Sequence, residues 1–338
     1  MNPFVSKPCK PDDALDAARP VEAIRAVLQA TDAQVLPIRT PSGPAAVRTI
    51  DLRRSAHLGL AHAVGDLADD ELLHDSIDSA TTWLAAAPGH TGAIVADGAS
   101  LTRVERTATP VRTAVVMAGG FGSRLRPLTD DTPKPLLEVG GRVLLYRILD
   151  HLQHHGFDRL FLSVHYLADR VRDAVGDGSD WGMTVDYLEE DEPLDTGAGL
   201  VLLEDVDEPF LIINGDILTT LNLTAFTRWH QLEQNLATIA TYRFAAPLPY
   251  GVVHGDDARI LEIEEKPVYR YDINAGVYAF SPEVLDLVEP RRPLAMVDFL
   301  NAQARVTERV RAFPIVEYWN DVGTHADFER AQTEVLEL

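Results

Sequence analysis

A glycine-rich loop follows an apolar run and could bind phosphate. The run is TAVVMA at residues 113–118, and the loop continues as GGFGSRLRPLT at residues 119–129. Glycines let the backbone approach a ligand closely and aim several N–H groups at one anion, although a tight connection after a strand is the simpler alternative. The two commonest phosphate-loop motifs are excluded, because no Gly-Lys-Ser/Thr sequence follows and Leu125 stands where a dinucleotide loop has its third glycine.

Two lysines provide a second candidate chemistry. Residues 111–338 contain 18 arginines but only two lysines, Lys134 and Lys266, and each lysine stands directly before a proline. The proline stiffens the backbone that presents the ammonium group. An ammonium is a compact charge with three donors, so its retention among arginines indicates a functional cation, with chance as the alternative.

Two aspartates stand next to glycines in positions suited to metal binding. Asp216, in Asn-Gly-Asp, follows the apolar run at residues 209–213, and Asp321 lies in YWNDVGT at residues 318–324. A carboxylate released by a glycine at the carboxyl end of a strand is a natural ligand for Mg²⁺. The alternative is that each aspartate caps a helix or a turn, which is a common position for this residue type.

The elements that must position these residues alternate along the chain. Apolar runs predict strands, and amphipathic segments predict helices. In chain order the predicted elements are strand 113–118, helix 143–155, strand 159–164, helix 166–175, strand 183–188, helix 198–204 and strand 209–214. This repetition predicts an α/β fold with a Rossmann-like, mixed but mainly parallel sheet, which binds ligands at the carboxyl ends of its strands. Residues 236–280 read as strands and turns, and we expect an antiparallel addition that forms a second wall over the site.

The composition fits a packed globular protein. The chain has 338 residues, 46% of them hydrophobic and 24% charged, and its formal net charge is −22. A chain this acidic lacks the basic footprint of nucleic-acid binding and would be repelled by an anionic membrane. One cysteine, Cys9, excludes an intrachain disulfide framework. No apolar run reaches the ~18 residues of a membrane span, so we expect a cytoplasmic protein.

Charge and proline content divide the chain near Pro110. Residues 1–110 carry 10 basic and 14 acidic side chains (net −4), whereas residues 111–338 carry 20 and 38 (net −18). We expect a flexible leader at residues 1–20 and a small α/β domain at residues 21–110. The candidate chemistry then falls in a catalytic domain at residues 111–338.

The ordered set of motifs resembles the sugar-1-phosphate nucleotidyltransferases, also called nucleoside-diphosphate-sugar pyrophosphorylases. The set runs AGGFGSRLRPLT, TPKPLL, NGD, EKP, NAGVY and YWNDVGT, and it covers essentially all of residues 111–338. VHYLADRVRDAVGDGSDWGMTVDYLEEDEPLDTGAG and VEYWNDVGTHADFERA look most like mannose-1-phosphate and related guanylyltransferases. The resemblance implies the nucleotide-diphospho-sugar transferase fold and Mg²⁺-dependent transfer of a nucleoside monophosphate from a nucleoside triphosphate, with GTP favoured, to a sugar 1-phosphate.

The resemblance also implies a role for each motif residue. Lys134, Arg124 and Asp216 would be catalytic, with Lys134 on the α-phosphate and Arg124 on the leaving phosphates. Asp216 and Asp321 would hold Mg²⁺. The nucleotide would be bound by Ala118, Gly119, Gly120, Gly122, Ser123, Arg124, Thr196 and Gly197. The sugar phosphate would be bound by Gly215, Glu265, Lys266, Asn274 and Gly276.

The choice of base and sugar stays open. Many guanylyltransferases have Leu-Gly-Thr-Ala-Gly where this chain has LDTGAG, and related uridylyltransferases for amino sugars carry an acidic residue at the position of Asp195. UTP, dTTP, ATP or CTP, and a heptose or cyclitol 1-phosphate, are the alternatives. We expect Glu189, Glu190 and Asp191 to form an ordinary solvated acidic loop, with acceptance from guanine N1–H and N2–H as the alternative. We expect His165 to be a turn residue, with a place on the pocket wall as the alternative.

Residues 21–110 resemble a degenerate pair of CBS modules. Two helix-like segments each precede a short strand, and VRTIDLRR resembles the end of such a module, although Arg48 replaces the usual Ser or Thr three positions before Asp51. Such a pair would sense an adenine nucleotide or, as the favoured alternative, serve only for packing or dimerisation, so a homodimer is one expectation.

Two other functions can be weighed on the same residues. A catalytically silent nucleotide-sugar sensor would regulate a partner through the N-terminal region, but Lys134, Asp216 and Asp321 are all present, which argues against it. A dinucleotide-dependent oxidoreductase would rest on the glycine loop alone, and that loop lacks the third glycine.

Overall fold

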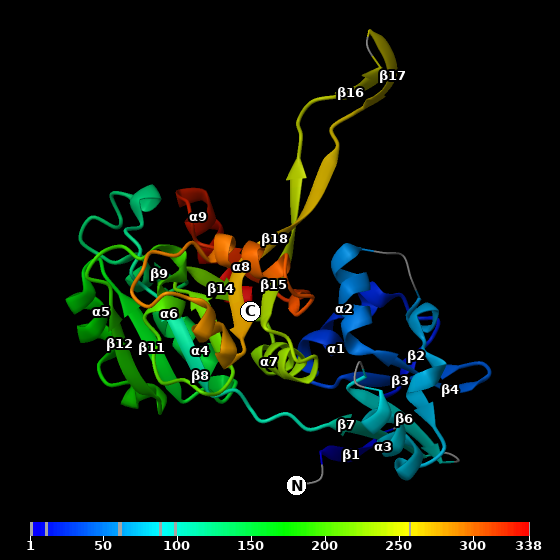
Figure 1. The fold of residues 1–338 in the computed structure, drawn as a ribbon. Helices are drawn as coiled ribbons and strands as arrows, with labels where there is room; N and C mark the ends of the chain where they lie inside the picture. The colour runs from blue at the N-terminus through cyan, green and yellow to red at the C-terminus, as the bar shows by residue number, and fades with distance from the viewer. Residues whose placement is uncertain are drawn as a thin grey trace.

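The computed structural model describes residues 3–10, 13–59, 63–87, 90–97, 100–256 and 258–337. The chain forms an N-terminal unit (residues 3–106) and a C-terminal unit (residues 113–337), joined by an extended segment and lying side by side (Figure 1). Within the described ranges, no helix is long and apolar enough to cross a membrane.

A seven-stranded sheet forms the centre of the C-terminal unit. In spatial order its strands are β12 (Thr184–Glu189), β11 (Arg159–Val164), β8 (Thr113–Met117), β13 (Phe210–Asn214), β18 (Val268–Phe280), β15 (Ala237–Pro247) and β19 (Val310–Pro314). β18 runs antiparallel to both of its neighbours, and the other pairs are parallel. The expected mixed, mainly parallel α/β sheet is therefore confirmed.

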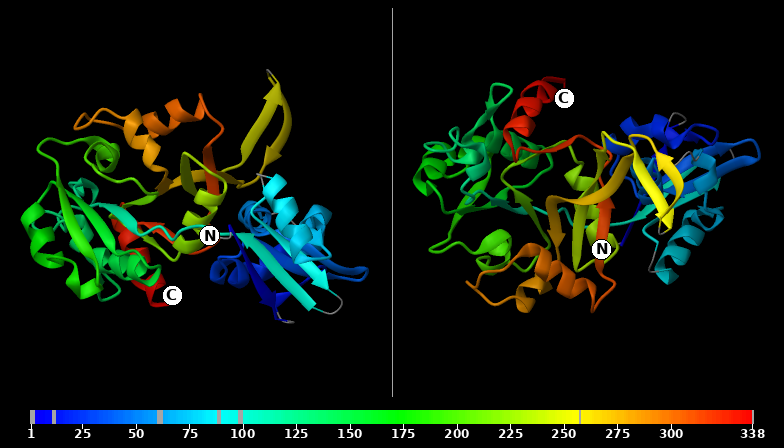
Figure 2. Two further views of the ribbon diagram at one scale, coloured as in Figure 1. Left: turned by 60° about the horizontal axis from the view of Figure 1, so that its bottom comes forward. Right: turned by 90° about the horizontal axis from the view of Figure 1, so that it is seen from above.

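Helices cover both faces of this sheet (Figure 2). One face packs against α4 (Leu144–His154), α5 (Ala168–Val175) and α7 (Leu223–Leu232). The other face packs against α6 (Ala198–Val201), the 3₁₀ helix η9 (Pro282–Leu287) and α8 (Met296–Ala304). Along β8, Ala114 and Val116 enter the first core and Val115 enters the second. Successive residues of a strand point to opposite faces, so burial of both faces explains the continuous apolar run.

Short elements complete the C-terminal unit. β9 (Glu138–Val139) pairs with β10 (Arg142–Val143), and β14 (Ile217–Thr219) pairs with β20 (Trp319–Asp321), both antiparallel. The final helix is α9 (His325–Glu334). The 3₁₀ turns are η5 (Ser123–Leu125), η6 (Lys134–Leu136), η7 (Ser179–Trp181), η8 (Asp195–Gly197) and η10 (Val335–Glu337).

An arm, residues 244–271, projects from the sheet (Figure 1). β15 and β18 stay paired out to Pro247 and Val268, and beyond them lies the hairpin β16 (Val252–Asp256) and β17 (Arg259–Glu264). Nine of the sixteen exposed large hydrophobic side chains among the described residues belong to the arm, so it does not pack as the rest of the unit does. The expectation that residues 236–280 form a wall over the site was wrong for the arm, because continuous pairing carries it outward.

The N-terminal unit contains two small sheets. The first has the order β1 (Phe4–Cys9), β7 (Ser100–Arg106), β6 (Gly92–Asp97) and β5 (Leu73–His74), and the second β2 (Leu15–Asp16), β3 (Val35–Thr40) and β4 (Gly43–Arg48). The helices are η2 (Val21–Ile24), α1 (Arg25–Ala30), α2 (Thr49–Leu58), η3 (Val64–Leu67), η4 (Asp70–Leu72) and α3 (Ile77–Ala86). The element order strand, helix, strand, strand occurs twice in this unit, as β2-α1-β3-β4 and as β5-α3-β6-β7. The resemblance to a CBS pair stays a prediction.

The expectation of a flexible leader was wrong for the first strand. β1 pairs antiparallel with β7 over six residues, from Phe4 opposite Arg106 to Cys9 opposite Leu101. β1 lies at the edge of its sheet, where Pro8 is tolerated because one side needs no backbone donor. Residues 1, 2, 11 and 12 of the expected leader lie outside the described residues.

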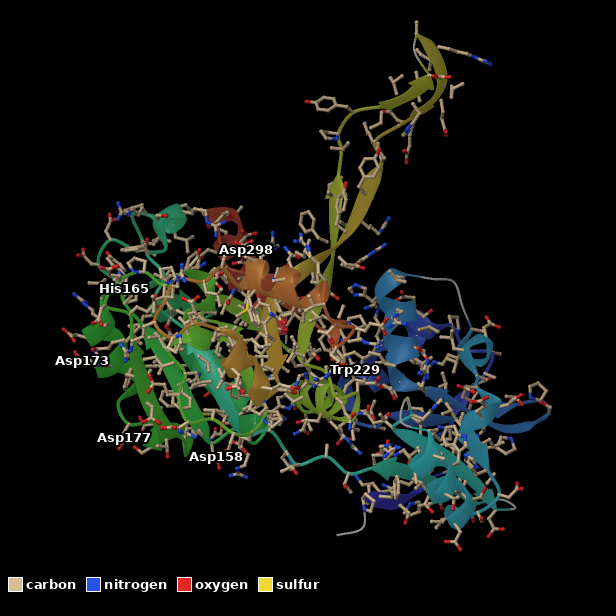
Figure 3. The ribbon with its side chains drawn as sticks, viewed as in Figure 1. Asp158, His165, Asp173, Asp177, Trp229 and Asp298 are labelled. Atoms are coloured by element: carbon tan, nitrogen blue, oxygen red, sulfur yellow. The ribbon has the colours of Figure 1, made fainter. Side chains whose placement is uncertain are left out.

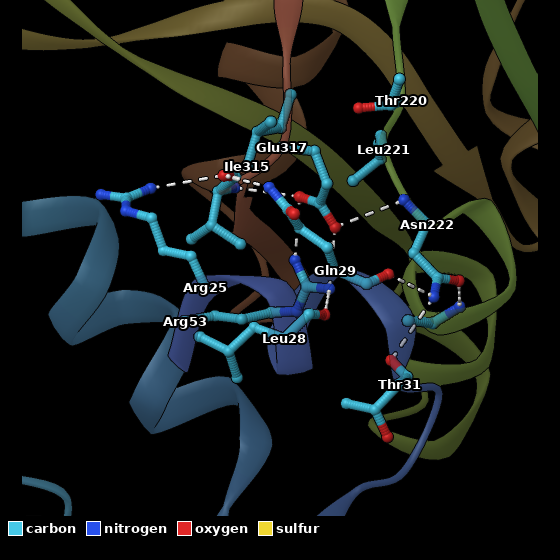
Figure 4. A network of polar contacts seen from close by, with 12 residues as sticks. Arg25, Leu28, Gln29, Thr31, Arg53, Thr220, Leu221, Asn222, Ile315 and Glu317 are labelled. Carbon is cyan, nitrogen blue, oxygen red and sulfur yellow. Dashed lines mark hydrogen bonds and ion pairs between the residues drawn. The ribbon is translucent and has the colours of Figure 1, made fainter. Parts of the chain in front are cut away.

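A buried ion pair joins the two units (Figure 4). Arg53 of α2 and Glu317, just before β20, are fully buried and make two bonds, with Nη1 donating to Oε2 at 3.0 Å and Nη2 to Oε1 at 2.9 Å. Arg53 also donates to the carbonyl of Leu28, and the backbone N–H groups of Val316 and Asn222 donate to the Glu317 carboxylate. These bonds offset the cost of removing both charges from water.

Glu317→Ala should lower the free energy of unfolding by about 3–5 kcal/mol, because it leaves the Arg53 charge buried without a partner. Urea unfolding of the full chain measures this difference. Glu22→Ala is the matched control, since Glu22 pairs with Arg25 on the surface and should cost less than about 1 kcal/mol. Equal effects of the two substitutions would contradict a structural role for the buried pair.

Candidate active site

The glycine loop is held against the ends of two other strands. The Ala118 N–H donates to the carbonyl of Ser163 at 2.9 Å, and the Gly215 N–H donates to the carbonyl of Met117 at 2.8 Å. A Cβ at Gly119 would lie 2.8 Å from Oε1 of Glu190, so a side chain cannot be accommodated without movement. The loop after β8 is thus packed tightly between the loops that follow β11, β12 and β13.

Gly122 sets the approach of this loop to Lys134. Its φ is +60°, a left-handed conformation that glycine adopts without strain. A Cβ there would lie 2.9 Å from Cγ2 of Thr129 and 3.1 Å from Cβ of Lys134. The hydroxyl of Thr129 in turn donates to the Gly122 carbonyl at 2.9 Å, which closes the turn.

Lys134 meets two carboxylates at one end of the cavity. Its Nζ donates to Oδ2 of Asp216 at 2.5 Å and lies 3.9 Å from Oδ1 of Asp321. The lysine is 8% exposed and opens the turn η6, between the two prolines noted in the sequence. A buried ammonium is therefore presented by a stiff segment to two acidic groups.

The two aspartates are neighbours because β14 pairs with β20. Asp216 directly precedes β14, Asp321 ends β20, and Ile217 lies opposite Asp321 in the register. The N–H of Val322 also donates to the carbonyl of Asp216 at 3.1 Å. A three-residue antiparallel contact thus brings together carboxylates that are far apart in the sequence.

The aspartates retain acceptor capacity that the described residues do not use. Oδ1 of Asp216 and Oδ1 of Asp321 are buried and have no hydrogen-bond partner among the described residues. Burial raises the pKa of Asp321, the Asp216 carboxylate raises it further, and Lys134 and Arg124 oppose the shift. Two carboxylate oxygens that lack a hydrogen-bond partner among the described residues, both near Lys134, fit a hard cation such as Mg²⁺.

A cavity of about 300 Å³ opens beside this cluster. It is lined by Met117, Gly119, Gly120, Phe121, Lys134, Pro135, His165, Glu190, Pro193, Asp195, Thr196, Asn214, Gly215 and Asp216. The lining lies at the carboxyl ends of β8, β11, β12 and β13, where a parallel sheet places its ligand site.

Most residues singled out from the sequence lie at or next to this cavity. The lining includes Gly119, Gly120, Lys134, Thr196, Gly215 and Asp216. Ala118, Gly122 and Ser123 belong to the same loop as Gly119 and Gly120. Gly197 follows Thr196 in the sequence, and its N–H donates to the Leu294 carbonyl.

Arg124, Asn274 and Gly276 lie beyond the lining on its two sides. A Cβ at Gly323 would lie 3.3 Å from Nη2 of Arg124, which places this guanidinium beside the turn after Asp321. Gly276 has φ +70°, and a Cβ there would lie 2.7 Å from Nδ2 of Asn214, a lining residue. The amide of Asn274 accepts from the Gly276 N–H and donates to the Tyr278 hydroxyl.

Glu265 and Lys266 are not brought to the cavity. Their side chains are 72% and 69% exposed, and both residues lie on the arm next to β17. Lys266 is eight residues along the ribbon from Asn274, which corresponds to about 25 Å at the rise of an extended strand. In this structure the arm therefore keeps both side chains away from the cavity, and their contact to the sugar phosphate stays a prediction from the sequence.

Glu190 and His165 lie on the cavity wall, whereas the sequence interpretation favoured a solvated loop and a turn and kept a base contact and a pocket wall as the alternatives. Glu190 accepts from the Ser163 hydroxyl at 2.7 Å and from the Leu194 N–H at 3.1 Å, so it is an anchored wall residue rather than part of a solvated loop. His165, labelled in Figure 3, lines the cavity, contacts the Glu190 carbonyl through Nδ1 and packs edge-on against Phe121. Their positions directly after β11 and β12 were the available signal.

Three comparisons with known proteins show what the C-terminal unit is similar to. The nucleotidyl transferase family model matches residues 113–337. Mannose-1-phosphate guanylyltransferase catalytic subunit beta of Drosophila pseudoobscura pseudoobscura is 31% identical over 223 residues, covering 64% of this chain and 60% of the relative. The mannose-1-phosphate guanyltransferase of Neurospora crassa is 32% identical over 225 residues, covering 64% and 62%. The chain therefore spans about three fifths of the length of these curated relatives.

A solved structure shares the fold of the C-terminal unit. HddC from Yersinia pseudotuberculosis, complexed with GMP-PN, superimposes with a TM-score of 0.52 at 27% sequence identity. The match covers 67% of this chain and 100% of that protein.

Asp321→Asn should stabilise the protein at pH 7 without divalent metal and abolish its stabilisation by Mg²⁺. The folded pKa of Asp321 is raised, so its charge opposes folding at neutral pH, and this opposition fades as pH falls through the folded pKa. Thermal unfolding at pH 7 and pH 5, with and without MgCl₂, measures both effects.

Asp169→Asn is the control for this measurement, since Asp169 is 97% exposed on α5. An unchanged response of the Asp321 variant to Mg²⁺ would show that the metal binds elsewhere.

Proposed function

Because the chain belongs to the nucleotidyl transferase family, we propose that it transfers a nucleoside monophosphate from a nucleoside triphosphate to a sugar 1-phosphate. A phosphate oxygen of the sugar 1-phosphate attacks the α-phosphorus, and the bond from that phosphorus to the oxygen bridging to the β-phosphate breaks. The products are a nucleoside-diphosphate sugar and pyrophosphate. The observation that carries this proposal is the convergence of Lys134, Asp216 and Asp321 beside the glycine loop.

The chain's own groups position and neutralise the phosphates. The backbone of Gly119 and Gly120 lies on the cavity wall, where N–H groups can donate to phosphate oxygens. Lys134 supplies a buried positive charge where negative charge develops in the transition state. Arg124 lies beside the turn that follows Asp321, and we assign it to the leaving phosphates. No covalent intermediate with the protein is needed, because positioning and charge neutralisation suffice for phosphoryl chemistry.

Asp216 and Asp321 fit a divalent metal. One oxygen of Asp216 accepts from Lys134, and its other oxygen, like Oδ1 of Asp321, is buried without a hydrogen-bond partner among the described residues. Mg²⁺ held by these two oxygens would neutralise charge on the bound phosphates.

GTP and a hexose 1-phosphate, mannose 1-phosphate first, are the proposed substrates. The support comes from the names of the similar proteins, which are mannose-1-phosphate guanylyltransferases, and from the GMP-PN complex of HddC. In this chain, Asp195 has φ +66° and its carboxylate accepts from the Thr196 N–H at 2.6 Å, so the acidic residue at this position folds back on the loop. That contact leaves it less free to recognise an amino sugar.

Lys134→Ala should lower kcat for pyrophosphate release by about 10²–10³-fold, because the variant removes a preorganised charge at the reacting phosphorus. The assay combines each of GTP, UTP, dTTP, ATP and CTP with a panel of hexose, heptose, amino-sugar and cyclitol 1-phosphates. Circular dichroism establishes that the variant is folded.

Lys7→Ala provides the matched control, since Lys7 is an exposed lysine of β1 in the N-terminal unit. Turnover with no substrate pair in the wild-type chain would overturn the proposed reaction. Stabilisation by a nucleotide sugar without turnover would instead support a silent sensor.

We keep Lys266 as a proposed contact to the sugar phosphate, made after the arm bends toward the cavity. Among the described residues, β15 and β18 connect the arm to the sheet, and the arm's side chains are largely exposed, so bending it disrupts little packing. Glu265 would then approach a sugar hydroxyl.

Lys266→Ala should raise KM for the sugar 1-phosphate at least tenfold and leave KM for the nucleotide within about twofold. Steady-state kinetics with each substrate varied in turn separates the two constants. Arg259→Ala, on the outer hairpin, is the control. Unchanged constants in the Lys266 variant would show that the arm stays outside the reaction.

A cytoplasmic location, a homodimer and nucleotide binding by the N-terminal unit stay predictions from the sequence.

A further inference from the structure

A second cavity lies between the two units. Its volume is about 280 Å³, and its wall is formed by the end of α2, by β15 and β18 where they leave the sheet, and by residues 315–317. The lining side chains that matter here are Arg25, His57, Tyr242, Arg243, Arg270 and Glu317. None of the three arginines takes part in the candidate active site.

Guanidinium donors outnumber their carboxylate partners at this cavity. Arg25 pairs with Glu22 at 2.6 Å and Arg243 with Asp272 at 2.6 Å, and the same Asp272 carboxylate lies 3.0 Å from Nε2 of His57. Arg270 has no carboxylate within ion-pair distance among the described residues, and its one hydrogen bond goes to the Val268 carbonyl at 3.5 Å. Arg25 also donates to the carbonyls of Ala56 and Val316, so Arg270 is the guanidinium here with most donors left for a further acceptor.

Arg243 provides a second indication that this cavity binds an anion. Its Nε is buried and has no hydrogen-bond partner among the described residues. A buried donor without an acceptor is costly unless a ligand or water satisfies it. Glu317 also faces the cavity, but its charge is neutralised by Arg53, so it does not satisfy these donors. In a chain of net charge −22, the convergence of three arginines from separate elements marks an anion site.

Phosphate is the anion that such a set recognises best. Planar guanidinium groups donate paired hydrogen bonds to phosphate oxygens, and a dianion can satisfy more than one arginine at once. The volume of about 280 Å³ exceeds what a single phosphate needs, so a small organic carrier can enter with the group.

The cavity is joined to the candidate active site by a short chain of contacts. The ring of Tyr242, on the cavity wall, stacks on Trp319 with ring centroids 4.8 Å apart. The indole N–H of Trp319 donates at 2.8 Å to the carbonyl of Ala275, between Asn274 and Gly276. Trp319 and Asp321 belong to the same three-residue strand, β20.

From these observations we propose that the cavity between the units binds a phosphate-bearing small anion, and that its occupancy alters the activity through β20. Arg25, Arg243 and Arg270 hold the phosphate group. Binding draws α1 of the N-terminal unit and the base of the arm together around residues 315–317, which lead directly into β20. The effect on activity rests on the proposed function, whereas the binding itself does not.

Isothermal titration of the full chain with inorganic phosphate, and separately with AMP, tests the binding. Arg270→Gln should weaken binding at least tenfold, and Arg270→Glu should abolish it. Because Arg270 has no carboxylate partner among the described residues, these variants leave no charge newly unpaired. Arg259→Gln, an arginine of the outer hairpin, should bind within about twofold of wild type, and so should Lys134→Ala, which alters only the candidate active site.

The variants separate the possible outcomes. Equal binding of phosphate and AMP supports recognition of the phosphate group alone, and tighter binding of AMP supports a nucleoside carrier. Three results would overturn the proposed site. They are no binding to the wild-type chain, unchanged binding to the Arg270→Gln variant, and a loss of binding that occurs only in the Lys134→Ala variant.

Initial rates of pyrophosphate release test the coupling. Phosphate or AMP should change kcat or KM at least twofold in the wild-type chain and in the Arg259→Gln variant. The same addition should leave kcat and KM unchanged through this site in the Arg270→Gln variant. Binding without such a change would overturn the coupling. An inactive wild-type chain would overturn the proposed function, and the titrations would still decide the binding.

Discussion

The pairing of β14 with β20 is the contact on which the candidate site depends. It comprises three residue pairs, yet it places Asp216 and Asp321 beside the same ammonium group. Isolated two-stranded pairs of this length are unstable, so the surrounding structure must hold both strands in place. The Val322 N–H bonded to the Asp216 carbonyl and the Trp319 indole bonded to the Ala275 carbonyl supply part of that support.

The N-terminal unit supplies another part. Glu317 lies four residues before Asp321, and its carboxylate is fixed by Arg53 from α2. The Arg25 guanidinium and the Gln29 amide also donate to the carbonyl of Val316. A unit with no described residue at the candidate active-site cavity thus restrains the segment that leads into β20. Such an arrangement explains how the N-terminal unit can bear on the geometry of the candidate site.

Local patterns predicted the central sheet but not the contacts between distant segments. The strand at residues 159–164 was predicted with its observed bounds, because burial on both faces produces a continuous apolar run. Asp216 followed from its place after such a run. Glu190 was misjudged, since its role comes from packing against Gly119 of another loop and from its bond with Ser163 of β11. The Arg53–Glu317 pair joins residues 264 positions apart, and no short-range pattern encodes it.

The two lysines of the C-terminal unit lie in very different surroundings. The C-terminal unit is strongly acidic, and phosphates can approach it only where charge is neutralised, so its buried lysine sits in a rigid turn between prolines. Lys266, its other lysine, lies on an exposed ribbon instead. An exposed two-stranded ribbon has low local stability and can change its angle to the sheet without breaking the core. The two roles proposed for these lysines, a rigid cation at the reacting phosphorus and a movable one for the sugar phosphate, are therefore compatible with one fold, because only the first must be preorganised.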